Sequence, residues 1–90
     1  MHNIFHLERT ILIGETSDVE GCVKYEIYRN EDSGITHAIA YKEFMVAKED
    51  GAEYMYWARI GSTTLVGGRE ICDAIELCEK NYEQLIGNKY

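Results

Sequence analysis

The sequence predicts an α+β fold, in which an antiparallel β-meander of four to five strands carries one C-terminal α-helix packed on one face. Three observations predict this class. Several segments alternate apolar and polar side chains as strands do, Asp50-Gly51 is a strong hairpin signal, and a helical pattern follows Gly67-Gly68. Ninety residues suffice for one core, so we expect residues 1–90 to form a single domain.

Two strands are expected in the first third of the chain. Residues 9–14 (RTILIG) predict a short strand, preceded by a frayed terminus and followed by an acidic loop at residues 15–21. Residues 22–29 (CVKYEIYR) alternate, which directs Val23, Tyr25 and Ile27 to one face of the sheet. The cluster NEDSG at residues 30–34 predicts a turn.

The middle of the chain predicts a hairpin. Residues 35–48 form a longer expected strand, with a bulge near Lys42 where the alternation slips. Residues 53–60 (EYMYWARI) return after the turn, and a brief strand is expected at residues 63–66. The alternation divides the returning strand between one face with Tyr54, Tyr56, Ala58 and Ile60, and another with Glu53, Met55, Trp57 and Arg59.

Residues 69–86 predict the helix. Its apolar positions recur in steps of four and three, as on a helix that lies against a sheet: Ile71, Ile75, Cys78, Tyr82 and Leu85. Gly68 is the expected N-cap, or Thr63 or Thr64 if the helix begins earlier, and Gly87 is the expected C-terminal cap.

The composition restricts the possible partners. Sixteen acidic against nine basic residues give a net charge of −7, which disfavours direct binding to nucleic acid or to an anionic membrane. Three cysteines without metal-type spacing, together with an N-terminus that lacks a signal-peptide pattern, predict reduced thiols in a cytoplasmic protein. The longest apolar runs are too short to cross a membrane.

An acidic surface is the most suggestive feature. Glu79 and Glu83 repel each other on the helix and lie toward its C-terminal half, where the helix dipole disfavours negative charge, so stability alone does not explain them. We expect this surface to bind a basic surface on a protein target, or else to be an ordinary solvated face. The candidate partner-binding residues are Glu49, Asp50, Glu70, Asp73, Glu76, Glu79 and Glu83, with Trp57 and Tyr28 on the sheet.

One helix can cover only one face of a sheet. The alternation places an apolar and aromatic set, which includes Tyr28, Met55 and Trp57, on the face opposite Tyr25 and Tyr54. We expect the helix to leave one of these two faces uncovered. Homodimerisation through that face or through an edge strand would cover it.

Catalytic and metal chemistry have weaker support. His37 follows Asp32 and Ser33, but this order is common in ordinary hairpins, and no third ligand accompanies His2 and His6. We therefore expect no catalytic residues, no metal and no cofactor. The glycine-rich segment 61–69 lacks the lysine of a phosphate-binding P-loop. It remains an alternative site for a small ligand or nucleotide, formed by Gly67, Gly68, Arg69 and Trp57.

Residues 54–82 resemble the sheet-then-helix end of AP2-type and integrase N-terminal arm-binding domains. Trp57, Arg59, Ile60, Gly67, Ala74 and Ile75 carry the likeness. The resemblance implies a shared shape, and in those families the strands that read DNA are basic. Here the corresponding strands carry Glu49, Asp50 and Glu53, which opposes that activity. In size and acidity the chain also resembles phage-encoded inhibitors of host defence, including anti-CRISPR proteins.

Two hypotheses follow. The first is a homodimeric, non-enzymatic inhibitor of the phage type that acts through its acidic surface on a host-defence or nucleic-acid-binding protein. The alternative is a small-ligand or nucleotide-binding protein with its site at the Gly61–Arg69 loop or at a dimer interface.

Overall fold

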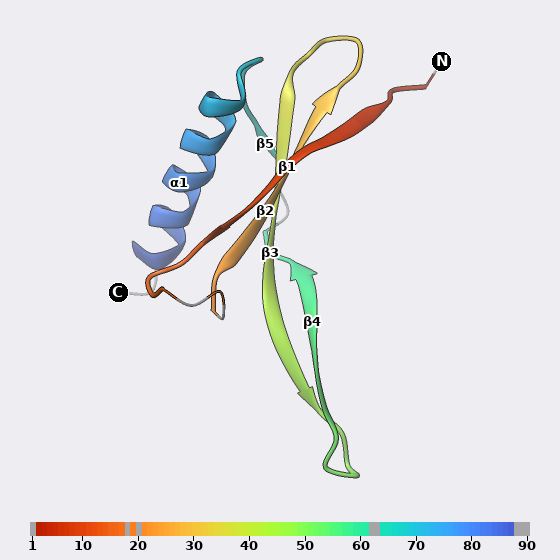
Figure 1. Ribbon diagram of the computed structural model, residues 1–90, viewed down its shortest axis with the longest axis vertical. Helices are drawn as coiled ribbons and strands as arrows, with labels where there is room; N and C mark the ends of the chain where they lie inside the picture. The colour runs from red at the N-terminus through yellow and green to blue at the C-terminus, as the bar shows by residue number, and fades with distance from the viewer. Residues whose placement is uncertain (1, 18, 20, 62–63, 88–90) are drawn as a thin grey trace.

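A computed structural model describes residues 2–17, 19, 21–61 and 64–87. The elements are β1 (Phe5–Ile13), β2 (Val23–Asn30), β3 (Thr36–Ala47), β4 (Glu53–Arg59), β5 (Leu65–Val66) and α1 (Ile71–Gly87). The sheet is antiparallel, with the order β1-β2-β3-β4, and β5 pairs with β3 (Figure 1). The predicted α+β meander with one C-terminal helix is therefore confirmed.

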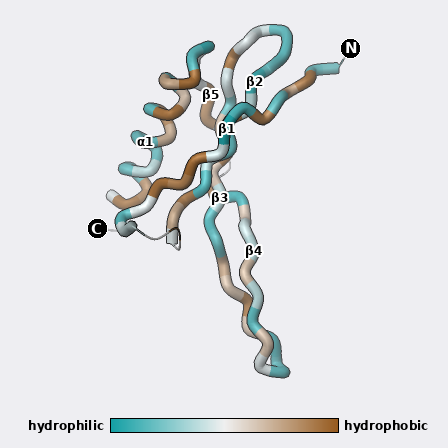
Figure 2. The backbone as a smooth tube through the Cα atoms, in the orientation of Figure 1, coloured by the Kyte–Doolittle hydropathy of each residue, from teal (hydrophilic) through white to brown (hydrophobic). Residues whose placement is uncertain are grey.

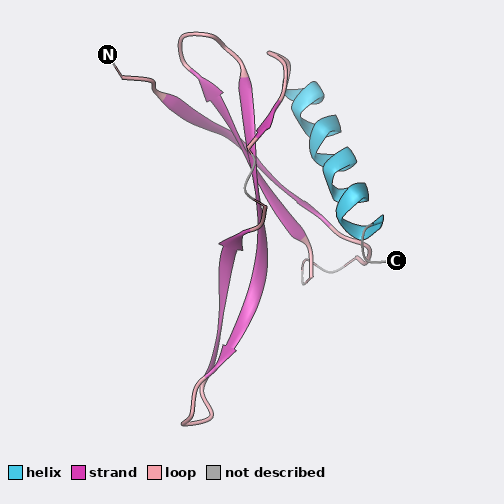
Figure 3. Cartoon of the chain, turned by 180° about the vertical axis from the view of Figure 1, so that it is seen from behind, coloured by secondary structure: helices cyan, strands magenta, loops and turns pink. Residues whose placement is uncertain are grey.

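Strand β3 belongs to two ladders that are offset along its length. Its residues 36–42 pair with β2, and its residues 41–47 pair with β4. Beyond Lys42, β3 has no described partner on the β2 side, so the hairpin projects away from the helix-covered sheet (Figures 1 and 3). We call this projection, residues 43–57, the arm. It explains a radius of gyration of 15.1 Å, against about 12 Å for a compact chain of this length.

The core lies between α1 and the other end of the sheet. Tyr25 and Ile27 of β2 are fully buried, and α1 contributes Ala74, Cys78 and Tyr82. Their cross-strand neighbours on β3 are small, because Ala38 lies opposite Ile27 and Ala40 lies opposite Tyr25, and small residues allow the helix to approach. Figure 2 shows α1 alternating between hydrophobic and hydrophilic residues, as an amphipathic helix does.

The hairpin turn at the tip of the arm forms as predicted. The Gly51 N–H donates to the Lys48 carbonyl at 3.0 Å, and the Lys48 N–H donates to the Ala52 carbonyl at 2.7 Å. Gly51 has φ +87°, a conformation that L side chains rarely adopt. The Asp50 carboxylate also accepts the Ala52 N–H. The turn at residues 30–34 is confirmed as well, since the Asn30 side chain accepts two backbone N–H groups.

The sheet departs from the sequence prediction at two places. The strand predicted at residues 9–14 begins at Phe5, so residues 5–8, His6 among them, belong to β1 and are not part of a frayed terminus. The bulge predicted near Lys42 is absent from the β2–β3 and β3–β4 registers; an irregularity occurs instead between Leu7 and Arg9.

The helix also begins later than predicted. It starts at Ile71, so Glu70 precedes it in place of Gly68 or Thr64, and Thr63 lies outside the described residues. Gly87 ends the helix as its last residue.

Candidate functional site

The outer surface of α1 is acidic. The side chains that the sequence assigned to this surface are all exposed: Glu70, Asp73, Glu76, Glu79 and Glu83. The last turn of the helix contains no basic residue. Lys80 partly offsets the charge, because its ammonium lies 3.4 Å from the Glu76 carboxylate, as the spacing of four residues predicts. The surface therefore combines uncompensated carboxylates with a rigid helical spacing.

A groove adjoins the C-terminal half of this helix. It lies between α1 and the end of β1 and has a volume of about 440 Å³. Glu15 reaches it from the loop after β1, while Glu79 and Glu83 reach it from α1. The other described lining residues are Leu12, Ile13, Gly14, Tyr82 and Ile86, so no basic side chain is among the described residues of this lining.

Tyr82 connects the groove with the core. Burial raises the pKa of its hydroxyl, and the nearby Glu15 carboxylate and Cys22 raise that pKa further. Glu15 also shares a side-chain hydrogen bond with Tyr82. The phenol therefore stays protonated at neutral pH and holds the Glu15 carboxylate at the groove. Three carboxylates in one groove with the apolar side chains of Leu12, Ile13 and Ile86 suit a lysine or arginine, whose long stem packs on apolar surface while its head pairs with oxygen.

The other predicted partner-binding residues lie elsewhere. Glu49 and Asp50 are exposed at the tip of the arm, which points away from α1 (Figure 1). Trp57 and Tyr28 occupy the sheet face that the helix does not cover, where the Lys24 ammonium lies 4.6 Å from the Trp57 ring centre. The fold thus divides the predicted set among the helix surface, the arm tip and the uncovered face.

The glycine-rich segment is engaged in holding the fold. The Gly67 N–H donates to the Thr36 carbonyl, and the Gly68 carbonyl accepts bonds from both the N–H and the hydroxyl of Thr36. The Arg69 carbonyl accepts from the Arg29 guanidinium. Trp57 pairs with Glu43, seven positions along β3 from Thr36, which corresponds to roughly 23 Å of strand. Within a single chain, Trp57 is therefore far from the Gly67–Arg69 segment.

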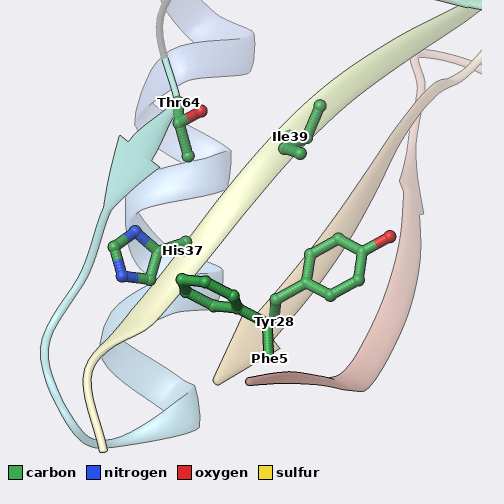
Figure 4. Close-up of a pocket in the computed structure, with 5 residues that line it drawn as sticks. All are labelled: Phe5, Tyr28, His37, Ile39 and Thr64. Atoms are coloured by element: carbon green, nitrogen blue, oxygen red, sulfur yellow. The ribbon is translucent and has the colours of Figure 1, made fainter. Parts of the chain in front are cut away.

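The uncovered face contains a shallow hollow of about 380 Å³. Figure 4 shows its lining residues, Phe5, Tyr28, His37, Ile39 and Thr64. The Phe5 and His37 rings meet edge to face, with their centres 5.4 Å apart. Ser33 accepts the Ile35 N–H, as a turn residue does. The described contacts of His37 and Ser33 are thus those of packing and turn formation.

Sequence reasoning overlooked Glu15. The signal that pointed to it was the acidic character of residues 15–21 directly after a strand, but no local pattern places that loop beside α1. Within the described ranges, no group of three or more His, Cys, Asp or Glu side chains has an arrangement that could hold a metal ion. The same residues include no helix with the length and apolar character needed to cross a bilayer.

No protein-family model, no curated protein and no solved structure matches this chain.

Proposed function

We propose that this chain is a non-enzymatic interaction protein whose acidic surface binds a basic surface on a protein target. The binding surface consists of the outer face of α1 and the groove at Glu15, Glu79 and Glu83. The observation that supports it is the convergence of these three carboxylates, from two segments distant in sequence, on one groove in which no described lining residue is basic. We call this surface the acidic surface.

The charge of the acidic surface suggests the kind of target. A row of exposed carboxylates on a helix complements the lysines and arginines with which proteins contact phosphate backbones. Occupying such a surface would exclude nucleic acid from it. The proposed activity is therefore inhibition of a nucleic-acid-binding protein inside the cell, in the manner of phage-encoded inhibitors of host defence. In this proposal the protein acts as a homodimer.

Salt and charge reversal test the proposal. The full chain, immobilised, is used to capture proteins from the source cell at about 50 mM and about 500 mM salt, since exposed charges are screened over about 10 Å at 0.1 M and less at higher salt. The captured target should be lost at high salt, and Glu83→Lys should release it at low salt. Glu49→Lys is the matched control, because it changes the net charge equally at the distant arm tip. Equal weakening by both variants, or capture indifferent to salt, contradicts the proposal.

A small-ligand site is the second candidate. The observation that favours it is the hollow at Phe5, Tyr28 and His37, whose volume lies in the range of small-molecule sites. Thermal unfolding in the presence of a panel of nucleotides and cyclic nucleotides tests this candidate. A ligand at one hundred times its dissociation constant adds about 2.7 kcal/mol to stability. Unchanged melting with every compound contradicts it.

A further inference from the structure

Strand β4 is an unprotected edge of the sheet. It ends the strand order, and among the described residues it pairs with β3 alone, in one continuous register. Edge strands are commonly blunted by proline, a bulge or inward-pointing charge. The other edge, β1, has its irregularity between Leu7 and Arg9, whereas β4 has no irregularity and the chain contains no proline. β4 is therefore the regular edge of this sheet.

The arm also exposes large apolar side chains on both of its faces. Phe44, Tyr54 and Tyr56 are 40–48% exposed on one face, and Met45 and Met55 are more than 50% exposed on the other. A two-stranded hairpin on its own is only marginally stable in water, and three or more strands or a packed face are needed for independent stability. The arm as a two-stranded ribbon thus lacks the third strand that would support it.

The hydrogen-bond pattern identifies which main-chain groups of β4 face outward. The Ile60 N–H donates to the Ala40 carbonyl, and Lys48 bonds Ala52 at the other end of the ladder. Bonded and non-bonded pairs alternate in an antiparallel ladder. With the observed register, Tyr54, Tyr56 and Ala58 direct their main-chain groups at β3. Those of Glu53, Met55, Trp57 and Arg59 point to the open edge.

This edge is complementary to itself. When β4 pairs antiparallel with β4 of a second copy about a two-fold axis at Tyr56, Glu53 lies opposite Arg59 of the partner subunit, and Met55 lies opposite the partner's Trp57. Both pairs use the outward main-chain groups, so the hydrogen bonds of the new ladder form without a change in the conformation of β4. On the other face Tyr54 lies opposite the partner's Ala58, which places a large side chain against a small one.

The register with its axis at Tyr56 is favoured over registers with the axis one residue away, both by its charge pairs and by the number of residues that it pairs. It pairs all seven residues of β4 and joins opposite charges at both ends of the strand. An axis at Met55 or Trp57 leaves residues unpaired and separates Glu53 from the partner's Arg59. In the described chain Glu53 forms no ion pair, and Arg59 bonds only the Thr64 hydroxyl. Methionine beside an aromatic ring is also a favourable contact.

We propose that two copies of this chain associate through β4 about a two-fold axis at Tyr56 and form one sheet with four consecutive strands from each copy. β4 of each arm then lies between two strands instead of at an edge, while residues 43–47 of β3 keep their open side. α1 packs against β2, β3 and β5, so the two acidic surfaces, each on a chain of net charge −7, lie at opposite ends of the assembly. This inference specifies the homodimer included in the proposed function, and it does not depend on the target of the acidic surface.

A charge exchange tests the pairing. Native mass spectrometry and sedimentation of the full chain should give twice the monomer mass of 10.4 kDa. Glu53→Arg and Arg59→Glu each place like charges opposite one another, so each should weaken dimerisation at least tenfold. The double variant E53R/R59E restores opposite charges and should recover the dimer to within about threefold of the original affinity. Far-UV circular dichroism confirms that each variant remains folded, since both side chains are exposed.

Cross-linking tests the register independently. In a Cys72→Ser background, Tyr56→Cys places a thiol on the axis, where Cα atoms of a non-bonded pair lie about 4.5 Å apart, within disulfide range. Copper-phenanthroline oxidation should then link the two chains. Tyr54→Cys is the matched control, because four residues of strand separate it from its counterpart in register, and it should not cross-link.

Three outcomes would each overturn the inference. The chain is a monomer at all concentrations, or Glu53→Arg leaves dimerisation unchanged, or Tyr54→Cys cross-links in preference to Tyr56→Cys. A monomer that still captures its target in a salt-dependent way overturns the dimer alone and leaves the acidic surface intact. A dimer that captures no target in a salt-dependent way overturns the proposed role of the acidic surface and leaves the dimer intact.

Discussion

Replacing Gly67 by alanine should destabilise the junction between β5 and α1. A Cβ atom at this position would lie 2.6 Å from the Thr36 hydroxyl and 3.3 Å from the Ala74 Cα. Neither neighbour moves easily, because Thr36 is fully buried with its hydroxyl bonded to the Gly68 carbonyl at 2.7 Å, and Ala74 is helix backbone. The added methyl group therefore displaces the helix or breaks that hydrogen bond.

The expected loss follows from these contacts. Overpacking costs about 1–3 kcal/mol, and a lost hydrogen bond costs about 1 kcal/mol. The reduced freedom of the unfolded chain returns about 0.4–1 kcal/mol. The net destabilisation is about 2 kcal/mol, which corresponds to a drop in melting temperature of roughly 8–16 °C for a domain of this size.

Urea unfolding at fixed protein concentration, followed by far-UV circular dichroism, measures the change. Gly87→Ala is the matched control, because its added Cβ would meet no described atom within 4 Å beyond its own helix backbone and chain neighbours, and it should change stability by less than about 1 kcal/mol. Equal stability of Gly67→Ala and the original chain would show that this junction is not close-packed. So would an equal loss in the two variants.

Three further predictions concern buried polar groups and thiols. Burial raises the pKa of the Cys78 thiol to about 11, so the contribution of the protonated thiol to stability is complete below the ordinary thiol pKa and is lost as the pH rises through 11. The free energy of unfolding should fall by roughly 2–3 kcal/mol over this pH window. Cys78→Ala should flatten that fall. A thiol reagent should modify one thiol per native chain, because Cys72 is exposed while Cys22 and Cys78 are buried; reaction of all three at the same rate would contradict this. Tyr25→Phe should cost about 1 kcal/mol in urea unfolding, because its hydroxyl donates to the Asn81 side chain at 2.7 Å; an unchanged midpoint would mean that this bond contributes nothing.

The sequence predicted those elements whose side chains alternate between a buried and an exposed environment. Tyr25 and Ile27 are fully buried as their alternation required, and Asp50-Gly51 forms the hairpin turn. The first half of β1 was missed because residues 5–10 are exposed on both faces of an edge strand. Burial imposes no period on such a segment, so its composition carries no strand signal.

The candidate site was predictable only in part. The exposed carboxylates of α1 follow from helical periodicity, which is a local property. The approach of Glu15 to Glu79 depends on the direction in which the helix crosses the sheet, and contacts between residues so distant in sequence leave no local pattern. The projection of the arm likewise depends on the offset between two ladders of β3, which alternation alone does not determine.

The continuity of β3 affects how the molecule would engage a large target. A single strand without interruption runs from beneath the helix to the tip of the arm, so no flexible linker separates the two parts. In an assembly joined at the arms, the two helices would be held at a constant span. Two basic sites spaced at that span would be bound by both helices at once, with the second contact favoured by a high effective concentration. Sites at another spacing would be bound by only one of the two helices.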